Sequence, residues 1–172
     1  MRILGIDPGV ATVGFGVIEN SSEDKHKVLD YGCITTKAGL PFSVRLQQIH
    51  RDLKIIMNKW QPAEIAIEEI FFSKNVKTGI KVAQARGAMM QQVLLEKRKV
   101  AEYKPQEIKE AVCGYGRADK KQLQKMVQLI LEMEETPKPD DAADALAIAI
   151  CHANNLRWLR ATRMSEGFLA RT

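Results

Sequence analysis

The sequence predicts an α/β domain in which helices cover both faces of a mixed five-stranded sheet. Short apolar runs of strand length alternate along the chain with longer segments in which apolar residues recur at helical spacing. The first three strands are joined by short turns, which can connect antiparallel neighbours but not parallel ones. The two later strands alternate with helices, so the whole pattern indicates a mixed sheet.

The apolar patterns and turn residues place each strand and helix at a definite range of residues. The strands are expected at Arg2 to Asp7, Thr12 to Glu19, Lys27 to Thr36, Glu64 to Glu68 and Val100 to Tyr103. The helices are expected at Phe42 to Trp60, Asn75 to Lys99, Gln106 to Val112, Asp119 to Met133 and Pro139 to about Leu159. Because no repeat or low-complexity linker interrupts the chain, residues 1–160 are expected to form one domain, and residues 161–172 a mobile C-terminal tail.

The helix expected from Asn75 carries a continuous apolar stripe. Helical spacing places on one face Val76, Ile80, Ala83, Gly87, Met90 and Leu94. We expect this face to pack on the core, although a helix of this length could also support a dimer.

The composition excludes several classes of protein. Of the 172 residues, 45% are hydrophobic and 27% are charged, as in ordinary globular proteins. No apolar run reaches the roughly 18 residues of a membrane span, and Asp7 falls where a signal peptide would be apolar, so a cytoplasmic protein is expected. The three cysteines show neither a C-x-x-C motif nor a zinc-site spacing, which indicates reduced thiols.

Positive charge is concentrated in the middle of the chain, and the formal net charge is +5. The segment from Ile70 to Leu95 contains no acid and includes Lys74, Lys77, Lys81 and Arg86. A second basic run contains Lys97, Arg98, Lys99, Lys104, Lys109, Arg117, Lys120, Lys121 and Lys125. One such run is typical of a solvated helix face, but two runs between acidic clusters favour binding to phosphates.

Two acids stand at the ends of apolar strands. Asp7 ends the first strand and Glu68 ends the fourth, where open α/β sheets form clefts. If these strands are neighbours, alternation puts Gly5 and Ala66 on the faces of the two acids, and such small residues leave room above the sheet for ions and a bulky substrate. Glu69 is an alternative to Glu68, because alternation alone does not say which of them faces the cleft.

The last helix brings a second pair of acids. Asp141 and Asp144 are three residues apart and therefore share one face near the helix N-terminus, whereas Asp140 is better explained as a cap or dipole partner. Four converging carboxylates require cations to relieve their repulsion, and oxygen ligands without His or Cys select Mg²⁺, with Mn²⁺ as a substitute. Alone, Asp141 and Asp144 are simply explained by helix capping and solvation, and Asp7 before Pro8-Gly9 by a turn. Their combination favours metal-dependent phosphodiester cleavage.

With these motifs in view, the sequence resembles the RuvC family of Holliday-junction resolvases from Ile3 to about His152. The motifs are Gly5-Ile6-Asp7-Pro8-Gly9 with Gly14-x-Gly16, Ala66-Ile67-Glu68-Glu69-Ile70-Phe71, Gln84-Ala85-Arg86-Gly87 and Asp141-Ala142-Ala143-Asp144-Ala145-Leu146-Ala147-Ile148-Ala149. The first motif alone is weak, and the last two in this order and at these distances are specific.

The resemblance implies an RNase H-like fold and a homodimer that cuts four-way DNA junctions by paired symmetric nicks during homologous recombination and DNA repair. Its metal-binding, catalytic acids would be Asp7, Glu68, Asp141 and Asp144, which selects Glu68 over Glu69. For DNA binding it implies Phe71, stacked on unpaired bases, together with Lys109 and Lys120. The residues alone make Lys121 an equal candidate, and Lys74 lies in the loop after Phe71. RuvA and RuvB would be partners by resemblance only.

Two other functions fit parts of the pattern. An actin-like ATPase begins with a similar Gly-Ile-Asp-x-Gly run, but it needs two lobes, and 172 residues hold barely one. An RNase H-like nuclease acting on structured RNA would keep the fold and change the substrate. A binding module with structural acids is a third alternative, which mutation of Asp7 would distinguish.

Overall fold

The computed structural model describes residues 1–21, 25–70 and 76–169, and it confirms the predicted mixed sheet and helices. The strands are β1 (Arg2–Asp7), β2 (Thr12–Asn20), β3 (His26–Thr35), β4 (Glu64–Glu68) and β5 (Val100–Tyr103). The helices are α1 (Phe42–Trp60), α2 (Val76–Leu95), α3 (Pro105–Cys113), α4 (Lys120–Ile130) and α5 (Asp140–Leu169).

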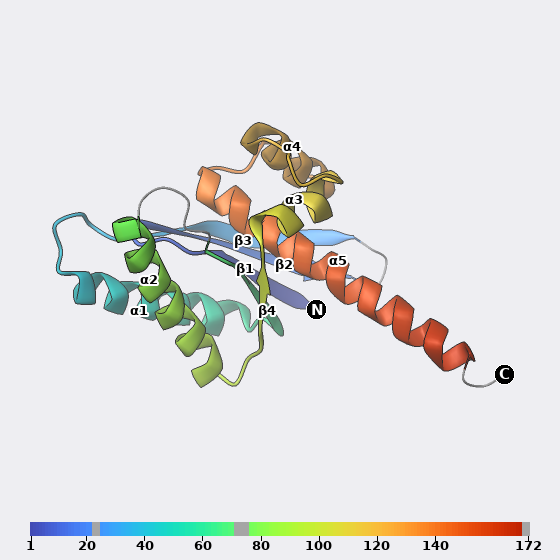
Figure 1. Ribbon diagram of the computed structural model, residues 1–172, viewed down its shortest axis with the longest axis horizontal. Helices are drawn as coiled ribbons and strands as arrows, with labels where there is room; N and C mark the ends of the chain where they lie inside the picture. Colours follow the sequence, from blue (N-terminus) through green and yellow to red (C-terminus); the bar gives the residue numbers. More distant parts are fainter. Residues whose placement is uncertain (22–24, 71–75, 170–172) are drawn as a thin grey trace.

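The five strands form one sheet in the order β3-β2-β1-β4-β5. The first three are antiparallel, and β4 and β5 extend the sheet in parallel with β1. Helices α1 and α2 lie on one face, and α3, α4 and α5 lie on the other (Figure 1). The sheet therefore separates two apolar cores, one containing Leu4, Leu53 and Met89, the other containing Ile3 and Leu146.

Helix α5 lies directly on strands β1 and β2 because glycines face it. Gly5 and Gly16 are paired across the two strands. A Cβ atom built on Gly16 would stand 2.8 Å from the backbone nitrogen of Leu146, and one on Gly5 would stand 2.7 Å from that of Ala149. The expectation that Gly5 leaves room above the sheet for substrate is therefore wrong, since the backbone of α5 fills that room.

The apolar face of α2 differs from the predicted stripe. Its fully buried apolar residues are Ala85, Met89 and Val93, whereas Ile80 and Leu94 are 50% and 60% exposed. Both sets recur at helical spacing. The choice between them depends on how the helix is rotated against α1 and the sheet, which the spacing of one helix does not determine.

Four helices end at other positions than expected, α3 by one residue, at Cys113 instead of Val112. Lys97 and Glu132 adopt left-handed backbone angles, which end α2 and α4 earlier than predicted. Helix α5 continues to Leu169, ten residues past its expected end, because no glycine or proline interrupts residues 160–166. None of the helices within the described ranges is long and apolar enough to cross a membrane.

The packing of α5 can be tested through Gly16. The change Gly16→Ala should lower the free energy of unfolding by about 1–3 kcal/mol, because the added methyl group meets helix backbone that cannot rotate away. Gly87→Ala is the matched control, since a Cβ atom there meets nothing within 4 Å. The control should be neutral or stabilising by up to about 1 kcal/mol. Denaturant titration of both variants measures the difference, and equal stabilities would contradict the close packing.

Candidate active site

The predicted acids lie on three adjoining elements. Asp7 is the last residue of β1 and Glu68 the last residue of β4, and these strands are parallel neighbours in register, with Ile6 opposite Ile67. Asp141 and Asp144 lie in the first turn and a half of α5. The carboxyl ends of two strands and the N-terminus of one helix therefore meet at one edge of the sheet (Figure 1).

A third glycine brings the helix acids close to Asp7. Gly14 is paired with Asp7 across β1 and β2. A Cβ atom on Gly14 would stand 3.2 Å from the Cβ atom of Asp7 and would collide with the backbone carbonyl group of Asp141. The absent side chain thus lets the backbone at Asp141 lie against the end of β1.

The four carboxylates act on one another electrostatically. Burial raises the pKa of Asp7 to about 8, and the charges of Glu68, Asp144 and Asp141 add to the effect, while Lys120 opposes it. Burial and Asp144 raise the pKa of Glu68 to about 7, against the opposing charge of Lys109. The pKa of Asp144 is also raised, mainly by burial. Such mutual repulsion is what a bound cation would relieve.

The donor set fits a hard divalent cation, because all four side chains offer carboxylate oxygens. Over the described part of the chain, however, no group of three or more His, Cys, Asp or Glu side chains is close enough to hold one ion. The acids are electrostatic neighbours rather than an assembled cage. A shared ion would have to draw their side chains inward.

Two lysines border the acids. The Lys120 ammonium group is 3.3 Å from a carboxylate oxygen of Asp140 and 3.5 Å from one of Asp144. Lys120 and Lys109 line a hollow of about 220 Å³ together with Glu68 and Asp144, over an apolar floor. Lys121 is exposed and forms no ion pair among the described side chains. The geometry therefore favours Lys120, which the sequence did not separate from Lys121.

Other candidate residues have different positions. Asp140 is the first residue of α5 rather than its cap, and its side chain accepts a hydrogen bond from Gln124 at 2.9 Å. The hollow that Asp144 and Lys120 border is lined by Glu68 and not by Glu69, which favours Glu68 as the acid of this cluster. Phe71 and Lys74 lie outside the described residues.

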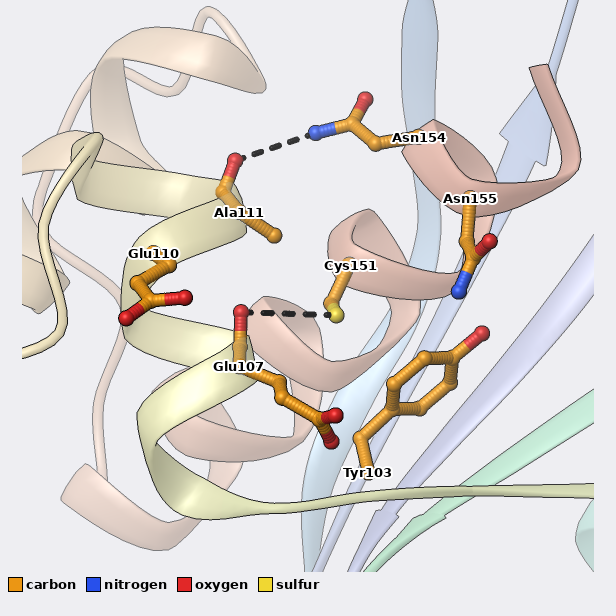
Figure 2. Close-up of a pocket in the computed structure, with 7 residues that line it drawn as sticks. All are labelled: Tyr103, Glu107, Glu110, Ala111, Cys151, Asn154 and Asn155. Carbon is orange, nitrogen blue, oxygen red and sulfur yellow. Dashed lines mark hydrogen bonds between the residues drawn. The ribbon is translucent and has the colours of Figure 1, made fainter. Parts of the chain in front are cut away.

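His152, on α5, is buried in a polar network with Tyr103 and Glu64. Its Nδ1 atom is 2.8 Å from the Tyr103 hydroxyl group, and its Nε2 atom is 3.4 Å from a carboxylate oxygen of Glu64. Burial lowers the pKa of the imidazole. The Tyr103 ring also borders a hollow of about 260 Å³ between α3 and α5, into which Asn155 and Cys151 project (Figure 2). None of the four acids lines that hollow, so this network supports α5 rather than the acids directly.

Sequence reasoning missed a third hollow, of about 470 Å³, which Asp141 borders on the side facing α1 and α2. Its cationic residues are Arg45 and Lys81. Lys81 belongs to a basic run, but Arg45 is isolated within the apolar pattern of α1. A lone charge next to the apolar positions of an amphipathic helix was the available signal.

Comparisons with known proteins agree with this geometry. The family model described as "Crossover junction endodeoxyribonuclease RuvC" matches residues 3–152. A relative of that name from Halothermothrix orenii is 50% identical over 157 residues, which cover 91% of this chain and 94% of the relative. A second, from Caldicellulosiruptor saccharolyticus, is 49% identical over 152 residues, covering 88% of this chain and 92% of the relative.

A solved structure of Thermus thermophilus RuvC superimposes with a TM-score of 0.86 at 33% identity, covering 92% of this chain and 96% of that one. The expected RNase H-like architecture is thereby confirmed. Because the family model matches residues 3–152 and a relative is 50% identical over 91% of this chain, the chain belongs to the RuvC family of crossover junction endodeoxyribonucleases.

Proposed function

We propose that this chain resolves four-way DNA junctions by paired symmetric nicks during recombination and repair, and that Asp7, Glu68, Asp141 and Asp144 are its catalytic acids. The observation that carries the proposal is geometric: Asp7 and Glu68 end neighbouring parallel strands, and Gly14 lets the start of α5, with Asp141, lie against Asp7. The acids from β1, β4 and α5 are thus close enough for their charges to act on one another. The related Thermus thermophilus RuvC has a solved complex with a Holliday junction substrate, and that chain matches this one with a TM-score of 0.84 at 31% identity.

The four acids would hold Mg²⁺, or Mn²⁺ in its place. When bound, such ions activate a water molecule and stabilise the leaving oxygen of a phosphodiester. The buried position of Asp7 strengthens its attraction to cations, because nearby water is limited. Lys109 and Lys120 face the same edge from α3 and α4, and we assign them to the phosphates of the cleaved strand.

Lys120 has a second role in this proposal. Its ion pairs with Asp140 and Asp144 hold the start of α4 against the start of α5. Since Asp144 would bind metal, the lysine would then be shared between Asp140 and the substrate phosphate. Phe71 would stack on unpaired bases, which tolerates any base sequence, and Lys74 and Lys121 would add phosphate contacts.

The assembly is also part of the proposal. Residues 1–160 would form the nuclease domain, with residues 161–172 as an appended C-terminal segment, in a cytoplasmic homodimer. Exposed apolar residues on α2, which are Ile80, Leu94 and Leu95, support the dimer because they form an uncovered face of one helix. RuvA and RuvB would be partners by family resemblance.

The catalytic assignment is tested by Asp7→Asn. This variant should lose nicking of a synthetic four-way junction by a factor of at least about 10³, because a neutral amide cannot replace the carboxylate at the cation. Its affinity for the junction should be retained or increased, because one repulsive charge is gone. Gel assays measure the nicking and the binding of the junction. The same assays with structured RNA and an RNA–DNA hybrid compare the junction with the alternative substrates. Wild-type nicking by this variant would end the catalytic claim.

The raised pKa of Asp7 predicts how stability depends on pH. The folded chain binds this proton more tightly than the unfolded chain does, with a pKa of about 8 against 3.8. Asp7 therefore stabilises the fold fully below about pH 4, and this contribution is lost as the pH rises to about 8. In metal-free buffer, the melting temperature of Asp7→Asn should rise relative to that of the wild type across this range. A constant difference between the two proteins would contradict the buried, repelled carboxylate.

Magnesium should reverse this effect. At pH 8, Mg²⁺ is expected to raise the melting temperature of the wild type more than that of Asp144→Asn, because the ion offsets carboxylate repulsion only where the full acid set is present. Thermal denaturation with and without the metal gives the comparison. Equal shifts in the two proteins would place the bound ion elsewhere.

Lys120 and Lys121 form a matched pair for the phosphate assignment. Lys120→Gln should reduce the slope of log affinity against log salt by about one phosphate contact. Lys121→Gln, with the same change of charge on an adjacent exposed residue, should alter the slope less. Fluorescence anisotropy with a labelled junction measures both, and a larger effect at Lys121 would reverse the assignment.

A further inference from the structure

The hollow beside Asp141 is lined from α1 and α2, which cover the opposite face of the sheet from α3 and α4, the helices that carry Lys109 and Lys120. Its walls come from the turn after β1, from α1 and from α2, and they include Gly9, Val10, Ala11, Thr12, Arg45, Thr78, Lys81 and Val82. Glu68 and Asp144 border the first hollow, and Asp141 borders this one. Acids of the cluster thus border both hollows, each of which has two cationic side chains.

Arg45 is held in place by a buried threonine. Its Nε atom donates a hydrogen bond of 2.7 Å to the Thr36 hydroxyl group, which in turn donates one of 2.6 Å to the backbone carbonyl oxygen of Val10. Thr36 is only 7% exposed. The guanidinium group is therefore fixed against the turn that leaves Asp7, so a ligand bound there would not have to order a flexible side chain.

The charges in this hollow favour an anion, because its two cationic side chains, Arg45 and Lys81, face a single carboxylate, that of Asp141. Among the ion pairs between described residues, none involves Arg45 or Lys81. With Nε bonded to Thr36, the two terminal nitrogens of Arg45 form the planar fork that suits phosphate oxygens. Lys81 is exposed on α2 and adds a second positive charge, while Val10 and Val82 offer apolar wall to a sugar ring.

We infer that Arg45 and Lys81 form a second phosphodiester subsite, which binds a DNA phosphate adjacent to the cleaved one, on the side away from Lys109 and Lys120. The inference rests on the proposed function. A DNA strand that passes over Asp7 carries one negative charge per nucleotide, so its phosphates must lie on both sides of the acids. With cations on one side only, the acids would repel the strand on the other side.

The subsite also gives Arg45 a positioning role. An arginine anchored through Thr36 to Val10 is coupled to the turn three residues after Asp7. A phosphate bound to it would fix the register of the strand against the acids. Loss of Arg45 should therefore weaken binding and also displace the cleaved bond from the acids.

Charge-neutral DNA gives the sharpest test. Junctions carrying a single methylphosphonate, which removes one phosphate charge, are bound to the wild type, Arg45→Gln, Lys81→Gln and Arg51→Gln in metal-free buffer. Arg51 is the matched control, since it lies on the same helix with its side chain 69% exposed and paired to Asp52. The wild type and Arg51→Gln should lose affinity when one phosphate next to the cut is neutralised, and Arg45→Gln and Lys81→Gln should be insensitive at that position.

The salt dependence supplies an independent result. Arg45→Gln and Lys81→Gln should each lower the slope of log affinity against log salt concentration by about one phosphate contact. Arg51→Gln should leave this slope unchanged. Slopes and methylphosphonate profiles equal to those of Arg51→Gln would overturn the subsite while leaving the resolvase proposal intact. Wild-type nicking by Asp7→Asn would instead defeat the catalytic assignment of Asp7, and a wild type that does not nick four-way junctions would defeat the resolvase proposal. If Arg45→Gln melts early through loss of its bond to Thr36, the exposed Lys81→Gln decides the question alone.

Discussion

The close contact between α5 and strands β1 and β2 is the constraint on which the rest of the site depends. Glycines at positions 5, 14 and 16 let helix backbone approach strand backbone without an intervening side chain. Apolar packing then holds the helix, through residues such as Leu146 and Ala149, which are fully buried. Because α5 begins with acids, the same contact that stabilises the fold places negative charge beside Asp7.

This arrangement couples stability to function in a specific way. Burying carboxylates next to one another costs free energy, and the raised pKa values of Asp7 and Glu68 express that cost. The surrounding structure tolerates it because two buried cores on opposite sides of the sheet fix the elements that carry the acids. A cation or a proton relieves the repulsion, and a strand of DNA would arrive at a site already flanked by lysines.

Much of the fold and of the acid site was predictable from sequence, because apolar residues recur at short, characteristic intervals in strands and in amphipathic helices. The bounds of β1, β4 and β5 and of α1 agree with the prediction residue for residue. Asp7 and Glu68 could be identified since each ends an apolar run, and Asp141 and Asp144 since they share a helix face. The final choice of Glu68 over Glu69 came from family resemblance, and the electrostatic coupling of Glu68 to Asp144 agrees with it.

What could not be predicted depends on tertiary packing. The rotation of α2 buries Met89 rather than Leu94, although both lie on apolar stripes. Gly5 looked like space for a substrate, and the structure fills that space with α5. Arg45 gave no sequence signal beyond its isolation, because its importance comes from Thr36 and Val10, which are distant in the chain but adjacent in the fold.

The central claim is that acids from β1, β4 and α5 share a divalent cation, and anomalous diffraction from crystals of the protein grown with Mn²⁺ tests it most directly. The account predicts an anomalous peak about 2.0–2.2 Å from a carboxylate oxygen of Asp7 and at similar distance from at least one of Glu68, Asp141 and Asp144. Manganese bound elsewhere, with no peak at Asp7, would contradict it.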